Sequence, residues 1–249
     1  MFSPLNHPES VVDRCTDALR NAILTGVLAV GSKLPPERSL AEQFDVHRGT
    51  VRAALDRLTE DGLLDVRQGR GYRVKDYRRS GGPDLLKSMA TIAAERGALL
   101  PLITDLLVVR RLLAVAVLDR IRERQEKLPA VEWAELRADI VAAVDVFGEA
   151  VAEGADLETL AQADVAVVAA LVAAAGSSVF SLCMNPLADT LFHIPSLRAA
   201  IYRDPETNLT GWRILEAWID MPKLAPVDVI LEQLRLRDEV VVDLLGDSA

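Results

Sequence analysis

Basic side chains suited to nucleic-acid recognition gather in one short stretch of the chain. Arg48 and Arg52 lie four residues apart, so a helix would place both on one face, with His47 and Thr50 near its start. An arginine guanidinium can donate two parallel hydrogen bonds to a guanine edge or to a phosphate. The alternative is that these arginines only solvate a helix surface, as most single surface charges do. Their position behind a tight turn favours the nucleic-acid interpretation.

The pattern of apolar residues predicts two short helices around these arginines. The first opens after Leu34-Pro35-Pro36 with Glu37 in its first turn, and it ends near Asp45. The second runs over about 48–61. Their inward-facing residues are Leu40, Ala41, Phe44, Val51, Ala54, Leu55 and Leu58. Two helices joined this tightly form a helix-turn-helix, and a further helix over 10–25, ended by Gly26, precedes them.

A β-hairpin is predicted directly after the helix-turn-helix. Residues 63–67 and 72–74 alternate as two strands, and Gln68-Gly69-Arg70-Gly71 forms the turn between them. This hairpin is the wing of a winged helix-turn-helix. Arg38 and the wing residues Gln68, Arg70 and Arg73 are then expected to contact flanking phosphates or the minor groove, although Arg73 could equally be a solvated side chain.

Charge is divided unevenly along the chain. The net charge of −9 argues against a general nucleic-acid binder. Residues 33–79, however, hold 11 Lys and Arg against 8 Asp and Glu, whereas residues 80–249 hold 15 against 26. A small basic segment therefore precedes a large acidic one.

Helical patterns dominate everything after the wing. Residues 78–83 break both periodicities and are predicted to be a linker. Amphipathic runs then cover 84–95, 101–125, 130–153, 157–175, 178–192, 206–220 and 227–245. The predicted fold is mainly α, with a winged helix-turn-helix DNA-binding domain at 1–77 and an all-α antiparallel bundle at 84–249 that binds ligand and dimerises.

Cysteine usage and hydropathy indicate a cytoplasmic protein. Cys15 and Cys183 are far apart in the sequence and have neither metal-ligand nor redox spacing. Residues 1–8 lack the charge and hydropathy pattern of a signal peptide, and the apolar run near 165–175 is interrupted before it reaches spanning length. No membrane association is therefore expected.

The N-terminal motifs resemble the GntR family of winged-helix regulators. The resemblance rests on LPPERSLA at 34–41, VHRGTVRAAL at 46–55, Leu58, GLL at 62–64 and QGRG at 68–71, and it spans nearly all of residues 10–75. It implies DNA contacts by Arg38, Arg48, Thr50, Arg52 and the wing Gly69, with His47 and Arg70 completing the predicted set. His47 stands where the family usually has Ser or Thr, so the helix is expected to lack that side-chain cap.

The helical part resembles the FadR branch of this family, whose ligand domains commonly bind small carboxylates through a divalent metal. Metal-binding members use an Asp with a His four residues later and further histidines on later helices. Here Asp164 begins a matching stretch, but Val168 and Trp212 stand at the histidine positions, and His193 is the single histidine after the wing. The resemblance therefore implies the fatty-acyl-CoA-responsive members, with no metal and no cofactor.

The same resemblance suggests a ligand site. Similar stretches at 80–86, 105–110 and 202–206 imply that Arg110 faces a cavity and holds an anionic or polar group. Val168, Trp212 and Tyr202 would then line an acyl chamber. Arg110 could instead be solvated or ion-paired, and Trp212 could be an ordinary core residue.

The sequence distinguishes between three classes of function: an enzyme, an architectural DNA-binding protein and a ligand-responsive regulator. An enzyme is disfavoured, because the sequence offers no Ser-His-Asp or Cys-His set and no phosphate-binding glycine loop behind a strand. An architectural DNA-binding protein would not need an acidic bundle more than twice the size of its basic head. The expected function is a homodimeric regulator that binds a double-stranded DNA operator and responds to a fatty acid or acyl-CoA, with a small organic acid as the alternative effector.

Overall fold

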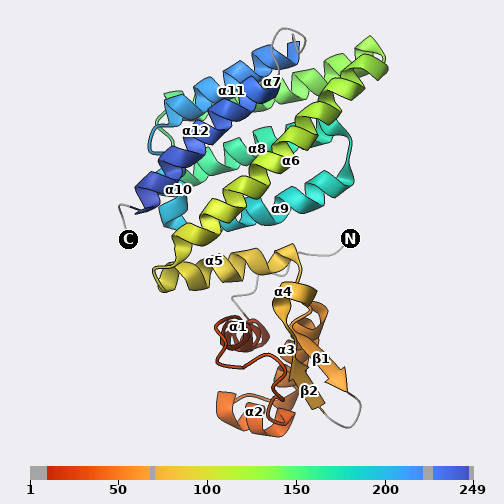
Figure 1. Cartoon of the computed structure of the whole chain (residues 1–249), viewed down its shortest axis with the longest axis vertical. Coiled ribbons are helices and arrows are strands. Elements are labelled where there is room, and N and C mark those ends of the chain that lie inside the picture. The colour runs from red at the N-terminus through yellow and green to blue at the C-terminus, as the bar shows by residue number, and fades with distance from the viewer. Residues whose placement is uncertain (1–9, 68–70, 221–226, 247–249) are drawn as a thin grey trace. The chain divides into compact units, whose positions relative to one another are not determined.

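The computed structural model describes residues 10–67, 71–220 and 227–246, and the chain divides into two compact units after Ile92 (Figure 1). The first unit contains α1 (Val11–Leu24), α2 (Glu37–Phe44), α3 (Arg48–Glu60), β1 (Leu64–Arg67), β2 (Gly71–Val74), α4 (Tyr77–Ser80), η1 (Pro83–Leu85) and most of α5 (Leu86–Glu95). The second contains α6 (Leu99–Lys127), α7 (Ala130–Ala152), α8 (Leu157–Ala175), α9 (Ser178–His193), α10 (Pro195–Ile201), α11 (Pro205–Asp220) and α12 (Val227–Gly246). The predicted mainly α fold with a two-stranded wing is confirmed.

Helices α2 and α3 begin and end where turn chemistry predicts. Helix α2 follows Pro36 and ends at Asp45, whose φ of 51° lies in the left-handed region that allows a sharp turn. Helix α3 follows His47, which occupies the N-cap position without forming a side-chain cap hydrogen bond. The predicted helix-turn-helix is confirmed, and so is the expectation that a histidine at position 47 does not cap α3 through its side chain.

The wing is an antiparallel hairpin whose register runs from Leu64 opposite Val74 to Arg67 opposite Gly71. Arg73 of β2 forms a hydrogen bond within the N-terminal unit, in which its Nη1 donates to the carbonyl of Gly31 at 2.8 Å. The wing-tip residues Gln68, Gly69 and Arg70 lie outside the described part of the chain.

One apolar core joins the three helices and the hairpin of the N-terminal unit. Its fully buried side chains come from α3 and the start of the wing: Val51, Ala54, Leu55, Leu58 and Leu63. Leu85 is also buried in this core, and Tyr77 and Met89 pack against it. The compact unit therefore continues through residue 92, whereas a linker was predicted at 78–83.

The chain between the wing and α5 is held by hydrogen bonds. Asp76 accepts a hydrogen bond from the backbone N–H of Arg78 at the start of α4, and the hydroxyl of Ser80 donates to the carbonyl of Gly62 at 2.6 Å. A Cβ added to Gly62 would collide with the Ser80 carbonyl, and Gly62 has a φ of 74°. Local polar contacts thus order a segment whose composition alone indicates a linker.

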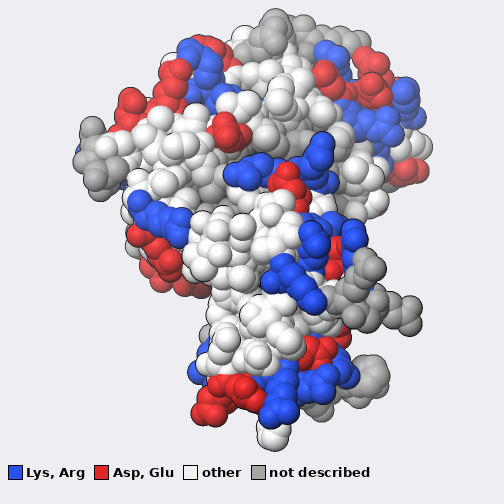
Figure 2. Space-filling model, turned by 60° about the horizontal axis from the view of Figure 1, so that its bottom comes forward, with Lys and Arg blue, Asp and Glu red and all other residues white. Residues whose placement is uncertain are grey.

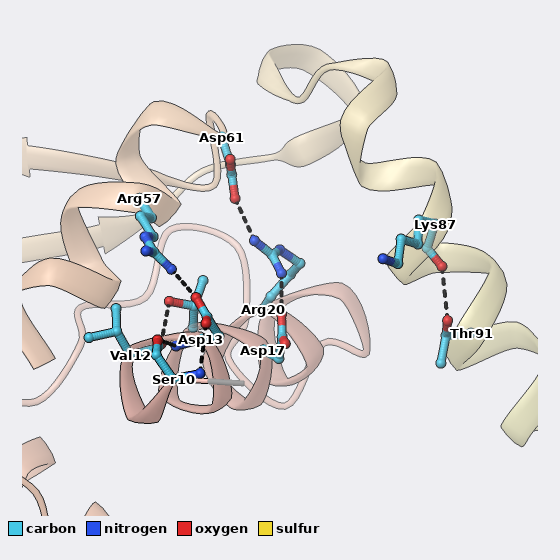
Figure 3. A network of polar contacts seen from close by, with 10 residues as sticks. Ser10, Val12, Asp13, Asp17, Arg20, Arg57, Asp61, Lys87 and Thr91 are labelled. Atoms are coloured by element: carbon cyan, nitrogen blue, oxygen red, sulfur yellow. Dashed lines mark hydrogen bonds and ion pairs between the residues drawn. The ribbon is translucent and has the colours of Figure 1, made fainter. Parts of the chain in front are cut away.

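Polar contacts join α1 to α3 and its C-terminal end (Figure 3). Ser10 and Asp13 form a capping box, in which the Asp13 N–H donates to Ser10 Oγ at 3.1 Å and the Ser10 N–H donates to Asp13 Oδ2 at 2.9 Å. Asp13 also pairs with Arg57 of α3, and Arg20 pairs with Asp61 at 2.8 Å. The Asp13 carboxylate therefore both caps α1 and binds α3.

The C-terminal unit is an all-helical bundle built around α8. This helix packs against α6, α7, α9 and α10, and its core includes Phe147, Val144 and Val167. Helix α10 was not predicted, although Pro195 at its first position is a usual helix-start signal. Seven residues are too few for the periodic apolar pattern that revealed the longer helices.

Among the described residues, α8 is one helix that is long and apolar enough to cross a membrane. Its 19 residues correct the prediction that this apolar run stops short of spanning length. Leu160, Val167 and Leu171 of α8 are buried in the core of the C-terminal unit. A core helix of a soluble protein has the same composition, so the helix is weak evidence for a membrane span.

The capping box predicts a specific acid sensitivity. Hydrogen bonding to Ser10 and then to Arg57 lowers the pKa of Asp13 from 3.8 to about 2. A lowered carboxylate pKa contributes stability above the unfolded-state pKa and loses it as the pH falls through the folded value. Asp13→Asn should therefore lower the melting temperature at pH 5–7, and the difference from wild type should shrink between about pH 4 and pH 2.

Circular dichroism melts across this pH range measure the effect. Asp17→Asn is the control, because it removes only an exposed pair within α1 and should change stability little. A melting difference for Asp13→Asn that stays constant from pH 6 to pH 2 would contradict the role given to this carboxylate.

Candidate nucleic-acid interface and internal cavity

The two arginines at the start of α3 share one carboxylate of α2. Arg48 Nε donates to Glu37 Oε2 at 2.8 Å, and Arg52 donates from Nε at 3.2 Å and from Nη2 at 2.9 Å. The arginine side chains are 65% and 57% exposed, while that of Glu37 is only 15% exposed. The hydrogen bond from Arg52 is the main cause that lowers the pKa of Glu37, so this carboxylate remains ionised. Glu37 therefore orients both guanidinium groups at the surface.

The other predicted interface residues surround this cluster. The Arg38 side chain is 85% exposed and pairs with Glu42 at 3.0 Å within α2. His47 is exposed, and Thr50 is partly buried in the first turn of α3. A Cβ added to Gly49 would meet no atom within 4 Å, so the surface here is open to close approach. Gly69 and Arg70 fall on the wing tip, outside the described residues.

Sequence reasoning missed the role of Glu37. It assigned this residue only to the positive end of the helix dipole, whereas the turn between α2 and α3 brings it against residues 11 and 15 positions later. Basic and acidic side chains lie next to each other over much of the face in Figure 2. The exposed arginines of the helix-turn-helix are thus partly neutralised in the protein without DNA.

The C-terminal unit contains an internal cavity of about 320 Å³. Its wall is formed by α6, α8, α9, α10, α11 and α12 and is mostly apolar. Three of the predicted ligand residues, Arg110, Val168 and Trp212, line it. Tyr202 is buried beside it and reaches the cavity wall through a hydrogen bond to Asp164. A volume of this size lies at the lower end of small-molecule sites, which usually combine an apolar lining with a few polar groups.

Asp164 of α8 is the acceptor for two buried donors. Tyr202 Oη donates to Asp164 Oδ2 at 3.0 Å, and Trp212 Nε1 donates to Oδ1 at 2.6 Å. Burial first, and the Asp164 charge second, raise the pKa of Tyr202, so its phenol stays protonated and able to donate. Each oxygen of the Asp164 carboxylate thus accepts one hydrogen bond from a neighbouring helix or helix end.

Nitrogen ligands for a metal are scarce around this carboxylate. Val168 follows Asp164 by one helical turn and offers no lone pair. His193 is exposed, and its Nδ1 donates to the carbonyl of Asp189 at 2.8 Å. Within the described ranges, no group of three or more His, Cys, Asp or Glu residues is arranged to hold a metal ion.

Arg110 lines the cavity but is ion-paired. It binds Asp238 of α12 through Nη2, and Arg111 binds the other oxygen of the same carboxylate at 2.5 Å. Asp238 is 3% exposed, so this is a largely buried charge cluster. Arg110 therefore forms the ion pair that the sequence analysis gave as an alternative to ligand binding. Its Nε is also buried, with no hydrogen-bond partner among the described residues.

Arg237 of α12 was missed as a cavity residue. It lines the same cavity beside Gly211 and Trp212 of α11. Burial is the main cause that lowers the pKa of Arg237, and Asp164 opposes this effect. The sequence signal was weak, because Arg237 sits in a helix that also carries Arg235, Asp238 and Glu239.

Comparison with known proteins is most specific for the N-terminal unit. Residues 12–74 match the family described as bacterial regulatory proteins, gntR family. The chain is 36% identical over 138 residues to the HTH-type transcriptional regulator Mce2R of Mycobacterium tuberculosis, covering 55% of this chain and 54% of that protein. The chain thus spans about half the length of the curated relatives it matches.

Two further comparisons extend into the helical unit. The chain is 30% identical over 158 residues to the fatty acid metabolism regulator protein of Pectobacterium carotovorum, covering 63% of this chain and 59% of that protein. A solved structure of Lar, described as controlling expression of the Listeria monocytogenes agr system, aligns with a TM-score of 0.57 at 13% identity. It covers 97% of this chain and 99% of Lar, and at this identity the likeness concerns the fold.

The matched family is described as regulatory proteins and Mce2R as an HTH-type transcriptional regulator, in agreement with the expectation that residues 12–74 bind DNA. The helix order, the antiparallel wing and the matched residues agree with that description. Residues 12–74 form a winged helix-turn-helix that is similar to the gntR family of bacterial regulatory proteins.

Proposed function

We propose that this chain is a cytoplasmic transcription regulator whose DNA affinity responds to a fatty effector bound in the C-terminal unit. The single observation that carries the proposal is the apolar cavity of about 320 Å³ in a unit separate from the winged helix-turn-helix. An architectural DNA-binding protein would have no use for such a cavity. In this proposal, residues 1–77 bind DNA, and the helical region from residue 84 onward binds the effector and forms the dimer.

The proposed DNA contacts lie at the start of α3 and around it. Arg48 and Arg52 read base edges, and Thr50, His47 and Arg38 contact the backbone. Gly69 and Arg70 of the wing reach the neighbouring groove or phosphates, as the family resemblance implies. Support comes from the exposure of Arg38, Arg48 and Arg52 and from the open surface at Gly49.

The proposed effector is a fatty acid or acyl-CoA bound without metal. The apolar lining supports this, because each buried methylene contributes about 0.8 kcal/mol. The likeness to a fatty acid metabolism regulator points the same way. The donors on both oxygens of Asp164 disfavour the alternative, a small organic acid held through a metal. The effector must bind one arrangement of the DNA-binding heads better than another, since equal affinity would shift nothing.

The two recognition-helix charges provide the first test. Arg48→Ala should cost about 1–3 kcal/mol of discrimination between the preferred duplex and a mutated one, because a bidentate base contact is lost. Arg70→Ala should instead weaken binding to all sequences alike. Glu37→Gln should strengthen binding to unrelated DNA by about 1 kcal/mol, the size of one charge interaction in water, and reduce discrimination because both arginines lose their orienting partner.

Fluorescence anisotropy with a duplex selected from a random library, a mutated duplex and a range of salt concentrations measures these effects. Arg235→Gln is the control, since Arg235 lies on α12 outside the winged helix-turn-helix. Unchanged discrimination by Arg48→Ala would show that α3 does not read bases.

A homodimer is the second expected outcome. One recognition helix contacts too few base pairs for useful specificity, and two half-sites restore it. The C-terminal unit offers exposed apolar side chains for such an interface, including Leu112 of α6 and Leu182 of α9, each about two-thirds exposed. Sedimentation equilibrium at micromolar concentration should give twice the chain mass of 27.1 kDa. A monomer, or full affinity for a non-palindromic site, would contradict this.

The effector is tested by calorimetry with fatty acids and acyl-CoA of several chain lengths. Affinity should rise with chain length until the cavity is full, by about fourfold per methylene at 0.8 kcal/mol. Bound ligand should also change the affinity for the selected duplex. Elemental analysis of the purified protein measures bound metal. Stoichiometric zinc, nickel or manganese, together with citrate binding that requires the metal, would show that the effector is a small organic acid instead.

A further inference from the structure

Arg237 lines the cavity, and no hydrogen-bond or ion-pair partner for it is found in the part of the chain that the structure describes. No described residue accepts a hydrogen bond from its guanidinium or pairs with it within ion-pair distance. A Cβ added to Gly211 of α11 would lie 3.0 Å from Arg237 Nη1, so the guanidinium lies against the cavity-lining surface of α11. Arg237 is partly buried at this mostly apolar wall, where a counter-ion would stabilise its charge.

The charged groups around this part of the cavity do not balance. Arg110 and Arg111 share the carboxylate of Asp238, and the Asp164 carboxylate is held by Tyr202 and Trp212. Arg237 adds the third guanidinium against two carboxylates. Asp164 and Asp238 attract Arg237 electrostatically and Arg110 repels it. One positive charge is therefore left over beside an apolar chamber.

We propose that Arg237, rather than Arg110, binds the carboxylate of a free fatty acid whose chain occupies the cavity, an inference that rests on the proposed function. The guanidinium fork matches a carboxylate in two parallel hydrogen bonds. A single excess charge is balanced by a single anion. The acyl-CoA thioester has no charge where its chain begins, and its several phosphates would exceed the one charge available.

Arg110 has a different part in this arrangement. Together with Arg111 it neutralises Asp238, which is buried and would otherwise repel an anion near Arg237. Asp164 is engaged by two donors, which weakens its own attraction for Arg237. Arg110 is thus a positioning residue, and Arg237 remains available to the ligand.

Binding of matched ligands tests the proposal. Laurate, 1-dodecanol and lauroyl-CoA share the chain and differ in the head group. Wild type should bind laurate about 10- to 100-fold more tightly than dodecanol, the value of hydrogen bonds to a charged group. Arg237→Gln should abolish this preference and leave dodecanol binding unchanged, and Arg237→Lys should retain part of it. Arg235→Gln is the matched control, because Arg235 lies on the same helix, exposed and paired with Glu232 and Glu239.

The outcomes separate this inference from the proposed function. Equal binding of laurate and dodecanol to wild type, or a preference that survives Arg237→Gln but disappears in Arg110→Gln, overturns only the role of Arg237. Lauroyl-CoA binding that exceeds laurate binding and is indifferent to Arg237→Gln overturns the choice of the free acid. Failure of all three chains to bind contradicts the proposed function as well.

A second measurement needs no ligand. Arg237→Met keeps the apolar stem and removes the unpaired charge, so the ligand-free variant should melt at a higher temperature than wild type. Arg110→Met should melt at a lower temperature, because it removes one of the two partners of buried Asp238. A lower melting temperature for Arg237→Met would show that the charge is already compensated and would overturn the proposal.

Discussion

The cavity of the C-terminal unit depends on one partly buried carboxylate. Asp164 projects from α8, and the donors that meet it come from Trp212 on α11 and from Tyr202 at the end of α10. Because buried polar groups are costly when unpaired, this three-way contact holds three chain segments at the cavity wall. Trp212 supplies an indole that donates to this carboxylate. The chemistry of the cavity follows from that contact.

A second constraint operates in the DNA-binding domain, where one carboxylate again organises arginines. Glu37 is held in the space between α2 and α3 and keeps Arg48 and Arg52 directed outward. The recognition surface is therefore prepared but partly neutralised, and phosphates must compete with Glu37 for the same guanidinium groups. Both units use a shared acid to set the direction of basic side chains. In the helical unit the arrangement leaves one guanidinium over, and this excess gives the cavity its polarity.

The helices and the wing could be predicted because their signals are local. Apolar residues three and four apart, the turn at Asp45 and the alternation along the wing strands act within a few positions of the chain. Other features depend on contacts with distant parts of the chain. The 78–83 segment was predicted to be a linker because its composition is typical of one, yet contacts of Ser80 with Gly62 and of Leu85 with the core order this region. Helix α10 was not predicted because two helical turns are too short to show a periodic apolar pattern.

The sequence by itself determined the winged helix-turn-helix, the all-helical second unit and the absence of histidines at the positions of a metal site. Tertiary structure alone decided which cavity arginine is neutralised. Arg110 and Arg111 pair with Asp238 across 128 and 127 positions, whereas the adjacent Arg237 forms no ion pair with any described acidic residue. A single sequence contains no signal for pairings of this range, because burial and ion pairing depend on how helices pack rather than on the spacing along any one of them.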